Sequence, residues 1–278
     1  MTNIEKLHRA DMAILKEVIK ICDEHGLKYY ALGGTMLGAI RHKGFIPWDD
    51  DIDLGMPRED YEFFLKTAPS ALSKTLKLIN YKTDKDYHYY ITRIQDVETK
   101  VMENRYESEG KYTHVSIDIF PLDGSPDNSL LRKLYFLRLM IHRAMMALHY
   151  KNGIDKERKR GIVEKIFLRV ITLLPTDKMF NAYRQKEKID KILKKYDMWT
   201  SVVSGNIMGA YRTVEMIPTA WYGKEAFYQF EDIKIRGIKE YDKYLHHLYG
   251  DYMQLPSVNA RKIHFRIVEI HGQKIEES

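Results

Sequence analysis

Four aspartates within five residues, Asp49-Asp50-Asp51-Ile52-Asp53, constrain the fold of this 278-residue chain more than any other feature. Apolar and aromatic residues lie on both sides of this cluster, and the residues after it alternate in the manner of a strand. In a strand, side chains at i and i+2 point to the same face. We therefore expect Asp51 and Asp53, together with Asp49, to project from one face while Ile52 enters the core.

Carboxylates held a few ångströms apart repel one another unless a cation lies between them. Hard oxygen ligands of this kind suit Mg²⁺ or Mn²⁺. A solvated acidic loop and a structural calcium site are the competing interpretations, but the flanking apolar residues argue against a solvated stretch. We therefore predict that Asp49, Asp51 and Asp53 bind a divalent metal ion.

The rest of the chain shows a helical and strand-like pattern in its first half and a mainly helical one in its second. The first half predicts helices at 4–25, 36–41 and 57–72 and strands at 27–32, 51–56, 88–96 and 114–120. The second half predicts helices at 130–150, 161–174, 177–196 and 241–249 and a short strand at 227–235.

A glycine pair lies just before the acidic cluster. Gly33, Gly34 and Thr35 stand between the first predicted strand and the short helix, where exposed backbone amides can hold phosphate oxygens. A glycine-pair turn, a short helix and an aspartate-x-aspartate strand resemble the local plan of the nucleotidyltransferase fold.

That fold requires a third carboxylate from a neighbouring strand. Asp118 lies within the β-prone run 115–120, and burial of an aspartate there is costly unless a metal or another partner compensates it. We predict a functional role for Asp118, with local hydrogen bonding as the alternative. Asp123 follows Pro121 and is interpreted as a turn former.

Cations are expected beside such a site because its substrate would carry phosphates. Arg41 and His42 leave the short helix just before the acidic cluster, and Arg93 lies in a β-prone run. We predict that these three side chains contact the substrate. Three other basic residues are equally well explained as surface residues: Lys43, Arg261 and His264.

Charge and cysteine content limit the classes of partner and compartment. The formal net charge of +6 is compatible with a polyanionic partner, and Cys22, the only cysteine, excludes an internal disulfide. The first residues lack the layout of a signal peptide, and no stretch approaches the roughly 18 uncharged apolar residues of a spanning helix. We expect a cytoplasmic protein, attached at most peripherally to the inner face of the cytoplasmic membrane.

The middle of the chain, residues 130–174, mixes large apolar side chains with many cations and few acids. Two interpretations stay open for it. One is an ordinary helical bundle whose long cations keep their charges in water. The other is a peripheral contact with an anionic membrane, which would be useful if the acceptor were lipid-linked.

The segment 31–53 closely resembles the signature of the LicD family, which includes the fukutin-type enzymes. The likeness continues through 56–61 and 117–124 and returns at 241–253, whereas 130–200 shows no match. The resemblance implies a nucleotidyltransferase-like fold that binds Mg²⁺ and a CDP-alcohol donor such as CDP-choline or CDP-ribitol. It also implies transfer of the phospho-alcohol group to a sugar hydroxyl of a surface glycan, with release of CMP. Bacterial members modify teichoic acid, lipopolysaccharide or capsule.

In that chemistry Asp51 and Asp53 would hold Mg²⁺ (or Mn²⁺) against the donor diphosphate. Asp49 would join them, and Asp118 would complete the site as ligand or general base. The expected fold class is α/β (α+β), a nucleotidyltransferase-like mixed sheet flanked by helices, with a mainly helical second half. We expect a catalytic core at 1–128, a basic helical insertion at 129–200 and a C-terminal part at 201–278 that packs back on the core.

Three alternatives remain at this point. The same fold could transfer a nucleotide to a small molecule or protein, which would release pyrophosphate instead of CMP. A basic nucleic-acid-binding module is disfavoured because the cations are not interleaved with aromatics on a strand platform, so no nucleic-acid partner is expected. The third alternative is an inactive scaffold that a metal stabilises.

Overall fold

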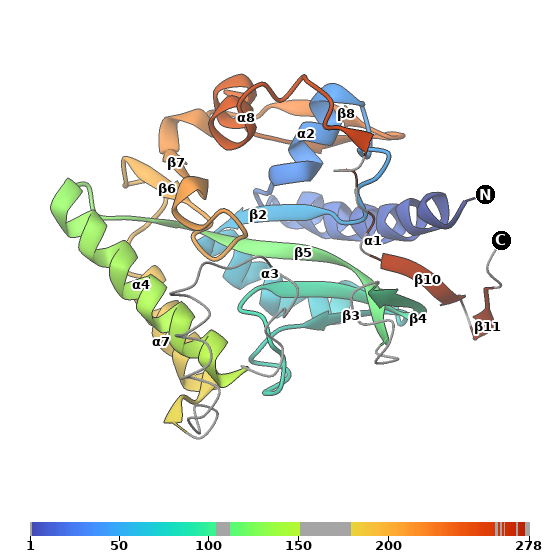
Figure 1. The fold of residues 1–278 in the computed structure, drawn as a ribbon, viewed down its shortest axis with the longest axis horizontal. Helices are drawn as coiled ribbons and strands as arrows, with labels where there is room; N and C mark the ends of the chain where they lie inside the picture. The colour runs from blue at the N-terminus through green and yellow to red at the C-terminus, as the bar shows by residue number, and fades with distance from the viewer. Residues whose placement is uncertain are drawn as a thin grey trace.

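The computed structural model describes residues 2–103, 112–150, 179–258, 261, 263, 265–270 and 272–275. Its first half contains three helices and five strands (Figure 1): α1 (Asn3–His25), β1 (Tyr30–Ala31), α2 (Gly33–Arg41), β2 (Asp53–Pro57), α3 (Arg58–Ala71), β3 (Leu76–Ile79), β4 (Thr92–Glu103) and β5 (Tyr112–Gly124). The second half adds two long helices and several short elements: α4 (Ser129–His149), α7 (Ala182–Leu193), β6 (Val203–Gly205), η3 (Arg212–Glu215), β7 (Met216–Pro218), η4 (Thr219–Trp221), β8 (Phe227–Phe230), β9 (Ile233–Arg236), α8 (Tyr241–Tyr249), β10 (Phe265–Ile270) and β11 (Gln273–Lys274).

The main sheet is mixed, and helices flank it as the sequence predicts. Its central strand order is β1-β2-β5-β4-β10-β11, with β3 on β4 and with β6 and β7 extending from β5. The pair β2 and β5 is parallel, and its register sets Asp53 beside Asp118. All other described strand pairs in this sheet are antiparallel. The expected α/β mixed-sheet class is therefore confirmed.

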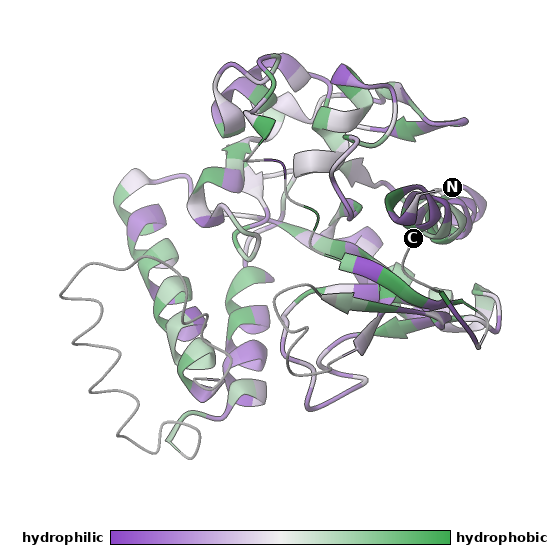
Figure 2. Cartoon of the chain, turned by 45° about the vertical axis from the view of Figure 1, so that its right-hand side comes forward, coloured by the Kyte–Doolittle hydropathy of each residue, from purple (hydrophilic) through white to green (hydrophobic). Residues whose placement is uncertain are grey.

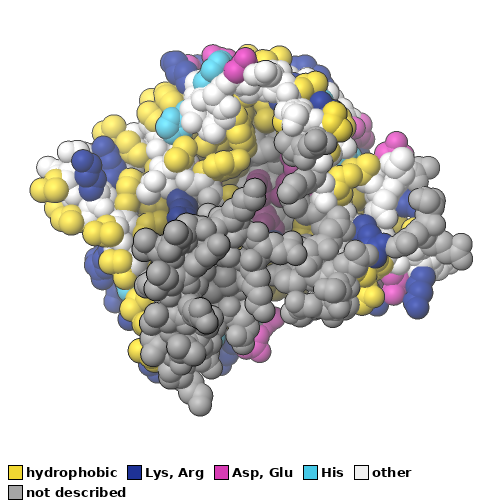
Figure 3. Space-filling model, in the orientation of Figure 1, with side chains coloured by type: hydrophobic (Ala, Val, Ile, Leu, Met, Phe, Trp, Pro, Cys, Tyr) yellow, Lys and Arg dark blue, Asp and Glu magenta, His cyan; other side chains and the backbone are white. Residues whose placement is uncertain are grey.

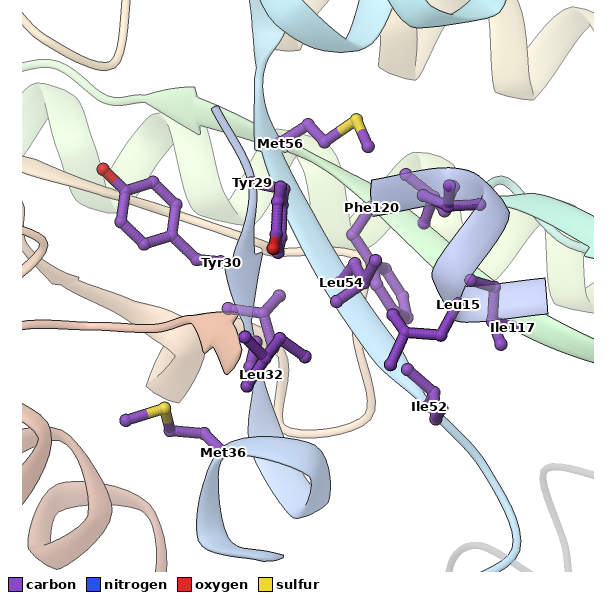
Figure 4. Close-up of a cluster of buried hydrophobic side chains, with 14 of the residues drawn as sticks. Leu15, Tyr29, Tyr30, Leu32, Met36, Ile52, Leu54, Met56, Ile117 and Phe120 are labelled. Carbon is purple, nitrogen blue, oxygen red and sulfur yellow. The ribbon is translucent and has the colours of Figure 1, made fainter. Parts of the chain in front are cut away.

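The core lies between this sheet and α1. Thr2 caps the helix in a capping box with Glu5, and Gly26 ends it with a φ of 66°. The buried side of α1 includes Leu15 and Val18, both fully buried. Figure 4 shows Leu15 among the apolar side chains that gather around β2. Burial of each large aliphatic side chain stabilises the fold by about 1.5–3 kcal/mol.

A second cluster of buried hydrophobic side chains holds α4 and α7 together, and these two helices lie beside the sheet (Figure 2). A buried ion network connects this pair to the core. Arg58, the first residue of α3, donates to Asp123 of β5 at 2.5 and 2.7 Å and to Asp190 of α7 at 3.1 Å. Asp123 is therefore a buried strand residue with an arginine partner, and the interpretation of it as a turn former is wrong.

Several boundaries differ from the sequence predictions. The helices expected at 4–25, 57–72, 130–150 and 241–249 are confirmed to within one or two residues. The short helix α2 begins at Gly33, so the glycine pair forms its first turn instead of preceding it. The strand expected from Asp51 begins at Asp53, because the acidic residues before it form an irregular segment.

Two further differences concern strands in the second half, and one predicted helix cannot be compared. The strand expected at 227–235 is a hairpin of β8 and β9, and β10 was not predicted. The helix expected at 161–174 lies outside the described residues. Among the helices that are described, none is both long enough and apolar enough to cross a bilayer.

Candidate active site

A cleft of about 420 Å³ opens between the acidic segment and the C-terminal half of the chain. One wall contains Gly33, Gly34, Asp49, Asp51 and Asp53. The opposite wall comes from the segment before β7 and from α8, and aromatic residues of both walls line the space: Trp48, Phe120, Tyr211, Tyr244 and Tyr249. Figure 3 shows acidic side chains within a hollow near the centre of one face.

The start of β2 fixes the position of Asp53. Its backbone amide donates to the Thr35 hydroxyl at 2.8 Å, and Thr35 is buried in α2. The hydroxyl of Thr35 is therefore used inside the protein, where it joins α2 to the acidic strand. The parallel register with β5 brings Asp118 next to Asp53.

The glycine pair allows the first turn of α2 to approach the acidic segment closely. Gly33 has a φ of +50°, a conformation that favours glycine, and its amide donates to the Tyr244 hydroxyl at 2.9 Å. A Cβ atom on Gly34 would overlap the Asp49 carboxylate. Both glycines line the cleft at the N-terminus of a helix, where the helix dipole favours an anion.

Negative charge is concentrated around Asp53. Burial raises the pKa of Asp53 well above its usual value, and the charges of Asp51, Asp118 and Asp49 raise it further. The residues that line the cleft in the described part of the chain include no Lys, Arg or His. Oxygen ligands of this type fit Mg²⁺ or Mn²⁺.

No three Asp, Glu, His or Cys side chains among the described residues stand in the arrangement of a preformed metal site. Mg²⁺ in phosphate chemistry is commonly bound by one or two carboxylates together with substrate phosphates, without an all-protein cage. The aspartates fit that open type of site, because Asp49, Asp51 and Asp53 all line the cleft beside the N-terminus of α2.

The predicted cations lie around the cleft and not on its walls. Arg93 pairs with Asp118, with 2.7 Å between Nε and Oδ1, and each side chain is 17% exposed. Arg41 donates to the Tyr252 carbonyl at 2.6 Å, and the His42 ring packs edge-on against Trp48. The structure therefore brings Arg93 to the third carboxylate.

The structure places two of the three basic residues that were equally well explained as surface residues. The Arg261 guanidinium lies 4.4 Å from the ring centre of Trp48, at the rim of the cleft. Lys43 is exposed and has a φ of 62°. His264 lies outside the described residues.

A small cavity of about 40 Å³ lies behind the acidic segment, lined by Asp11, Asp50, Asp51, Arg93 and Asp118 among others. Both carboxylate oxygens of Asp11 are buried without a hydrogen-bond partner among the described residues. Burial raises the pKa of Asp11 well above its usual value, and the neighbouring aspartates add to the shift. Asp50 accepts a hydrogen bond from the Phe265 amide at 2.7 Å, which ties β10 to the acidic segment.

Sequence reasoning missed the far wall of the cleft. Glu215, Asn206 and Tyr211 come from the segment before β7, and Tyr249 comes from α8. Burial raises the pKa of Glu215 to about 7, although the hydrogen bonds that its carboxylate accepts act to lower the pKa. None of these residues belongs to a compact motif, although the familial likeness at 241–253 does include Tyr249.

Comparison with known proteins agrees with this geometry. Residues 26–147 match the family described as LicD/FKTN/FKRP, nucleotidyltransferase domain. The chain is 29% identical over 250 residues to the lipopolysaccharide cholinephosphotransferase LicD of Haemophilus influenzae. The aligned region covers 88% of this chain and 89% of that protein.

Two further relatives match shorter segments. The uncharacterized protein RT0683 of Rickettsia typhi is 28% identical over 131 residues, 46% of this chain and 40% of that protein. The human ribitol 5-phosphate transferase FKRP is 42% identical over 52 residues, 19% of this chain and 10% of that protein. The glycine pair, the acidic segment and Asp118 all fall within the matched range 26–147, so the part of the chain that builds the near wall of the cleft is similar to the LicD/FKTN/FKRP nucleotidyltransferase domain.

Proposed function

We propose that this chain, a LicD-type phosphotransferase, moves a phospho-alcohol group, phosphocholine or a similar group, from a CDP-activated donor to a sugar hydroxyl of a cell-surface glycan and releases CMP. The observation that carries the proposal is the convergence of Asp49, Asp51 and Asp53 with the N-terminus of α2 in one cleft. The extended similarity to a cholinephosphotransferase supports the same reaction class. The glycan could be lipopolysaccharide, teichoic acid or capsule.

The reaction requires one bond to form and one to break. The acceptor oxygen bonds to the phosphorus that carries the alcohol, and the bond from that phosphorus to the bridging oxygen breaks, so CMP leaves with the electron pair. The proton of the acceptor hydroxyl passes to a carboxylate. We assign that role to Asp118, which Arg93 holds beside Asp53.

The protein contributes mainly positioning and charge compensation, as expected for phosphoryl transfer. The amide of Gly34 would face donor phosphates at the N-terminus of α2, whereas the amide of Gly33 is bonded to the Tyr244 hydroxyl. Asp51 and Asp53 would hold Mg²⁺ or Mn²⁺, with Asp49 and Asp118 beside them. A bound divalent ion would offset charge on the attacked phosphate and on the leaving nucleotide.

The direct test measures CMP release from CDP-choline and CDP-ribitol with a glycan acceptor, with and without Mg²⁺. Asp51→Asn and Asp53→Asn variants should fold normally and lose the metal-dependent release. Asp232→Asn, at an exposed surface position, is the matched control and should keep full turnover.

The products separate this proposal from its alternatives. Pyrophosphate in place of CMP would indicate nucleotide transfer to a small molecule or protein. Unchanged turnover in both variants would remove the proposed mechanism. A chelator that changes the thermal midpoint of a protein without any turnover would support the inactive scaffold.

The surface of α4 favours a peripheral contact with an anionic membrane, where a lipid-linked acceptor would be met. One side of this helix exposes half or more of four apolar residues at helical spacing: Leu130, Leu134, Leu137 and Ile141. The helix contains Arg132, Lys133, Arg138 and Arg143 and no acid. Figure 3 shows basic and hydrophobic side chains together at the side of the molecule where Figure 1 draws α4. Such a helix suits the boundary of an anionic leaflet.

Co-sedimentation with vesicles tests this contact. The protein should bind vesicles that contain anionic lipid at low salt and should bind neutral vesicles much less. Replacement of Leu134 and Leu137 by Glu should abolish the binding, whereas Phe63→Glu, at an exposed apolar position on α3, should not. Absence of binding at low salt would end the membrane proposal and leave the transferase proposal intact.

A further inference from the structure

The far wall of the cleft holds a carboxylate in a fixed orientation. One oxygen of Glu215 accepts a hydrogen bond from the Tyr211 amide at 2.8 Å, and the other accepts from the Asn206 side-chain amide at 3.0 Å. Glu215 itself lines the cleft. Its carboxylate is therefore held in place and faces the space in which a substrate would lie.

The segment around Glu215 is built to hold that position. A Cβ atom on Gly209 would overlap the Glu215 carboxylate, so glycine allows the backbone to pass close to it. Arg143 of α4 donates to the carbonyls of Ile207 at 3.2 Å and of Gly209 at 2.9 Å. A site whose supporting groups are themselves fixed loses little entropy when it binds a ligand.

Aromatic rings lie beside this carboxylate. Tyr211 packs edge-on against Tyr249, with ring centres 5.7 Å apart at an interplanar angle of 86°, and both rings line the cleft. Aromatic faces attract cations through the ring quadrupole, and quaternary ammonium groups are bound in this manner. A quaternary ammonium ion donates no N–H hydrogen bond. The charge of a carboxylate can therefore attract it even when both carboxylate oxygens already accept hydrogen bonds from the protein.

We propose that Glu215, Tyr211 and Tyr249 form a subsite for a positively charged ammonium group on the donor's alcohol, so that the cleft selects a cationic alcohol over a polyol. This inference rests on the proposed function, because it assigns the alcohol end of the same donor. The aspartates of the near wall would face the donor phosphates through a metal ion. Glu215 on the far wall would face the positive charge of the ammonium group. A neutral polyol would leave the buried carboxylate of Glu215 uncompensated.

A pair of donors that differ only in charge tests the subsite. CDP-choline and CDP-3,3-dimethylbutanol have alcohols of the same shape, with a carbon atom in place of the ammonium nitrogen in the second. We expect kcat/KM of the unmodified protein to be at least about tenfold higher for the cationic donor. Glu215→Gln should lower kcat/KM for CDP-choline about tenfold and change it less than about threefold for the neutral donor.

A second variant keeps the test decisive if Glu215→Gln does not fold. Tyr249→Leu removes one aromatic face and should reduce the same preference for the cationic donor. Equal losses on both donors in these variants would assign Glu215 to the chemistry or to the folding of the segment and overturn the subsite. Turnover of CDP-ribitol as efficient as that of CDP-choline would also overturn it, while the transferase function would stand.

Binding without turnover separates the two proposals. Calorimetric titration of the unmodified protein with phosphocholine and with 3,3-dimethylbutyl phosphate should show at least about tenfold tighter binding of phosphocholine. If no CDP-alcohol is turned over but this preference is present, the proposed function fails and the subsite stands. Equal binding of the two phosphates would overturn the subsite.

Discussion

Two regions of this molecule bring several carboxylates together, and they differ in how the charge is compensated. At the junction of α3, β5 and α7, Arg58 lies between Asp123 and Asp190, and Tyr90 also donates to Asp190. In the cleft, Asp49, Asp51, Asp53 and Glu215 share a lining that includes no basic side chain among the described residues. In the first region an arginine lies between the carboxylates, whereas in the second Asp53 lies among other carboxylates.

The pKa shifts differ in the effect of the neighbouring charges, since burial raises the pKa of Asp123 while the charge of Arg58 acts to lower it. Asp190 has a lowered pKa because the charge of Arg58 and its hydrogen bonds outweigh the cost of burial. Asp53 has a raised pKa because burial and neighbouring carboxylates act in the same direction. We infer that the Arg58 network stabilises the fold, whereas Asp53 lies among like charges whose repulsion a bound cation would relieve.

The largest expected effect is on activity, at Asp53. Asp53→Asn should reduce turnover by about 10²–10³-fold or more, because a charge that compensates the reacting phosphate is lost. Its thermal midpoint in EDTA should stay equal or rise, since the change removes repulsion. Parallel turnover assays and thermal scans of Asp53→Asn and unmodified protein check this. A large fall in the midpoint would mean that Asp53 belongs with the structural network.

The reverse outcome is expected at Arg58. Arg58→Met should destabilise the fold by about 3–5 kcal/mol, because the buried carboxylate of Asp123 loses its arginine partner, whereas Asp190 keeps Lys194 at 2.7 Å. That corresponds to a thermal midpoint lower by about 5–9 °C for a chain of this size. Lys16→Met, which removes an exposed ion pair with Asp232, is the matched control and should shift the midpoint little. Equal midpoints for the two variants would contradict the distinction between the regions.

The dependence of stability on pH should identify the charged cleft. The folded-state pKa of Glu215, about 7, lies above its usual value of 4.5, so the folded protein binds this proton more tightly than the unfolded chain. Its contribution to stability is therefore present below pH 4.5 and is lost as the pH rises to about 7. Urea unfolding in EDTA across this range should show the loss, and Glu215→Gln should make it smaller.

Asp11 should contribute to the same loss of stability with rising pH, since its pKa is also raised in the folded protein. Asp11→Leu should raise the free energy of unfolding at pH 7 in EDTA by about 1–3 kcal/mol, because it removes a buried polar group that has no hydrogen-bond partner among the described residues. A lower free energy of unfolding in this variant would show that Asp11 has a stabilising partner.

The smallest effect is expected at Thr35. Thr35→Val keeps the shape but leaves the Asp53 amide without its acceptor, at a cost of about 1 kcal/mol and a few-fold decrease in turnover. Assays of turnover and unfolding on the same preparation measure both. Thr67→Val, at a half-buried position of α3 outside the cleft lining, serves as the control. Unchanged turnover would show that Thr35 does not position Asp53.

The sequence predicts the near wall of the cleft because that wall is local. The glycine pair and the acidic segment are 20 residues or so apart, and short-range periodicity identifies the elements between them. The third carboxylate, Asp118, is recognisable because an acid in a β-prone apolar run requires a partner. These signals depend on neighbours in the chain.

The far wall and the buried network depend on contacts between distant segments. Glu215 is an ordinary acid in the sequence, and only the packing of the β7 region against α8 brings it to the cleft. Asp123 resembles a turn former after Pro121, and its arginine partner lies 65 residues earlier. β10 was not predicted because its pairing with β4 joins segments that are far apart in the chain.

The parallel pairing of β2 and β5 limits how this chain can change. Consecutive side chains of a strand point to opposite faces, so insertion or deletion of one residue before Asp118 would turn its carboxylate away from Asp53. Length changes within β5 are therefore tolerated only in steps that preserve the alternation, whereas the segments that build the opposite wall carry no such restriction. Divergence in substrate preference is expected to accumulate on that opposite wall.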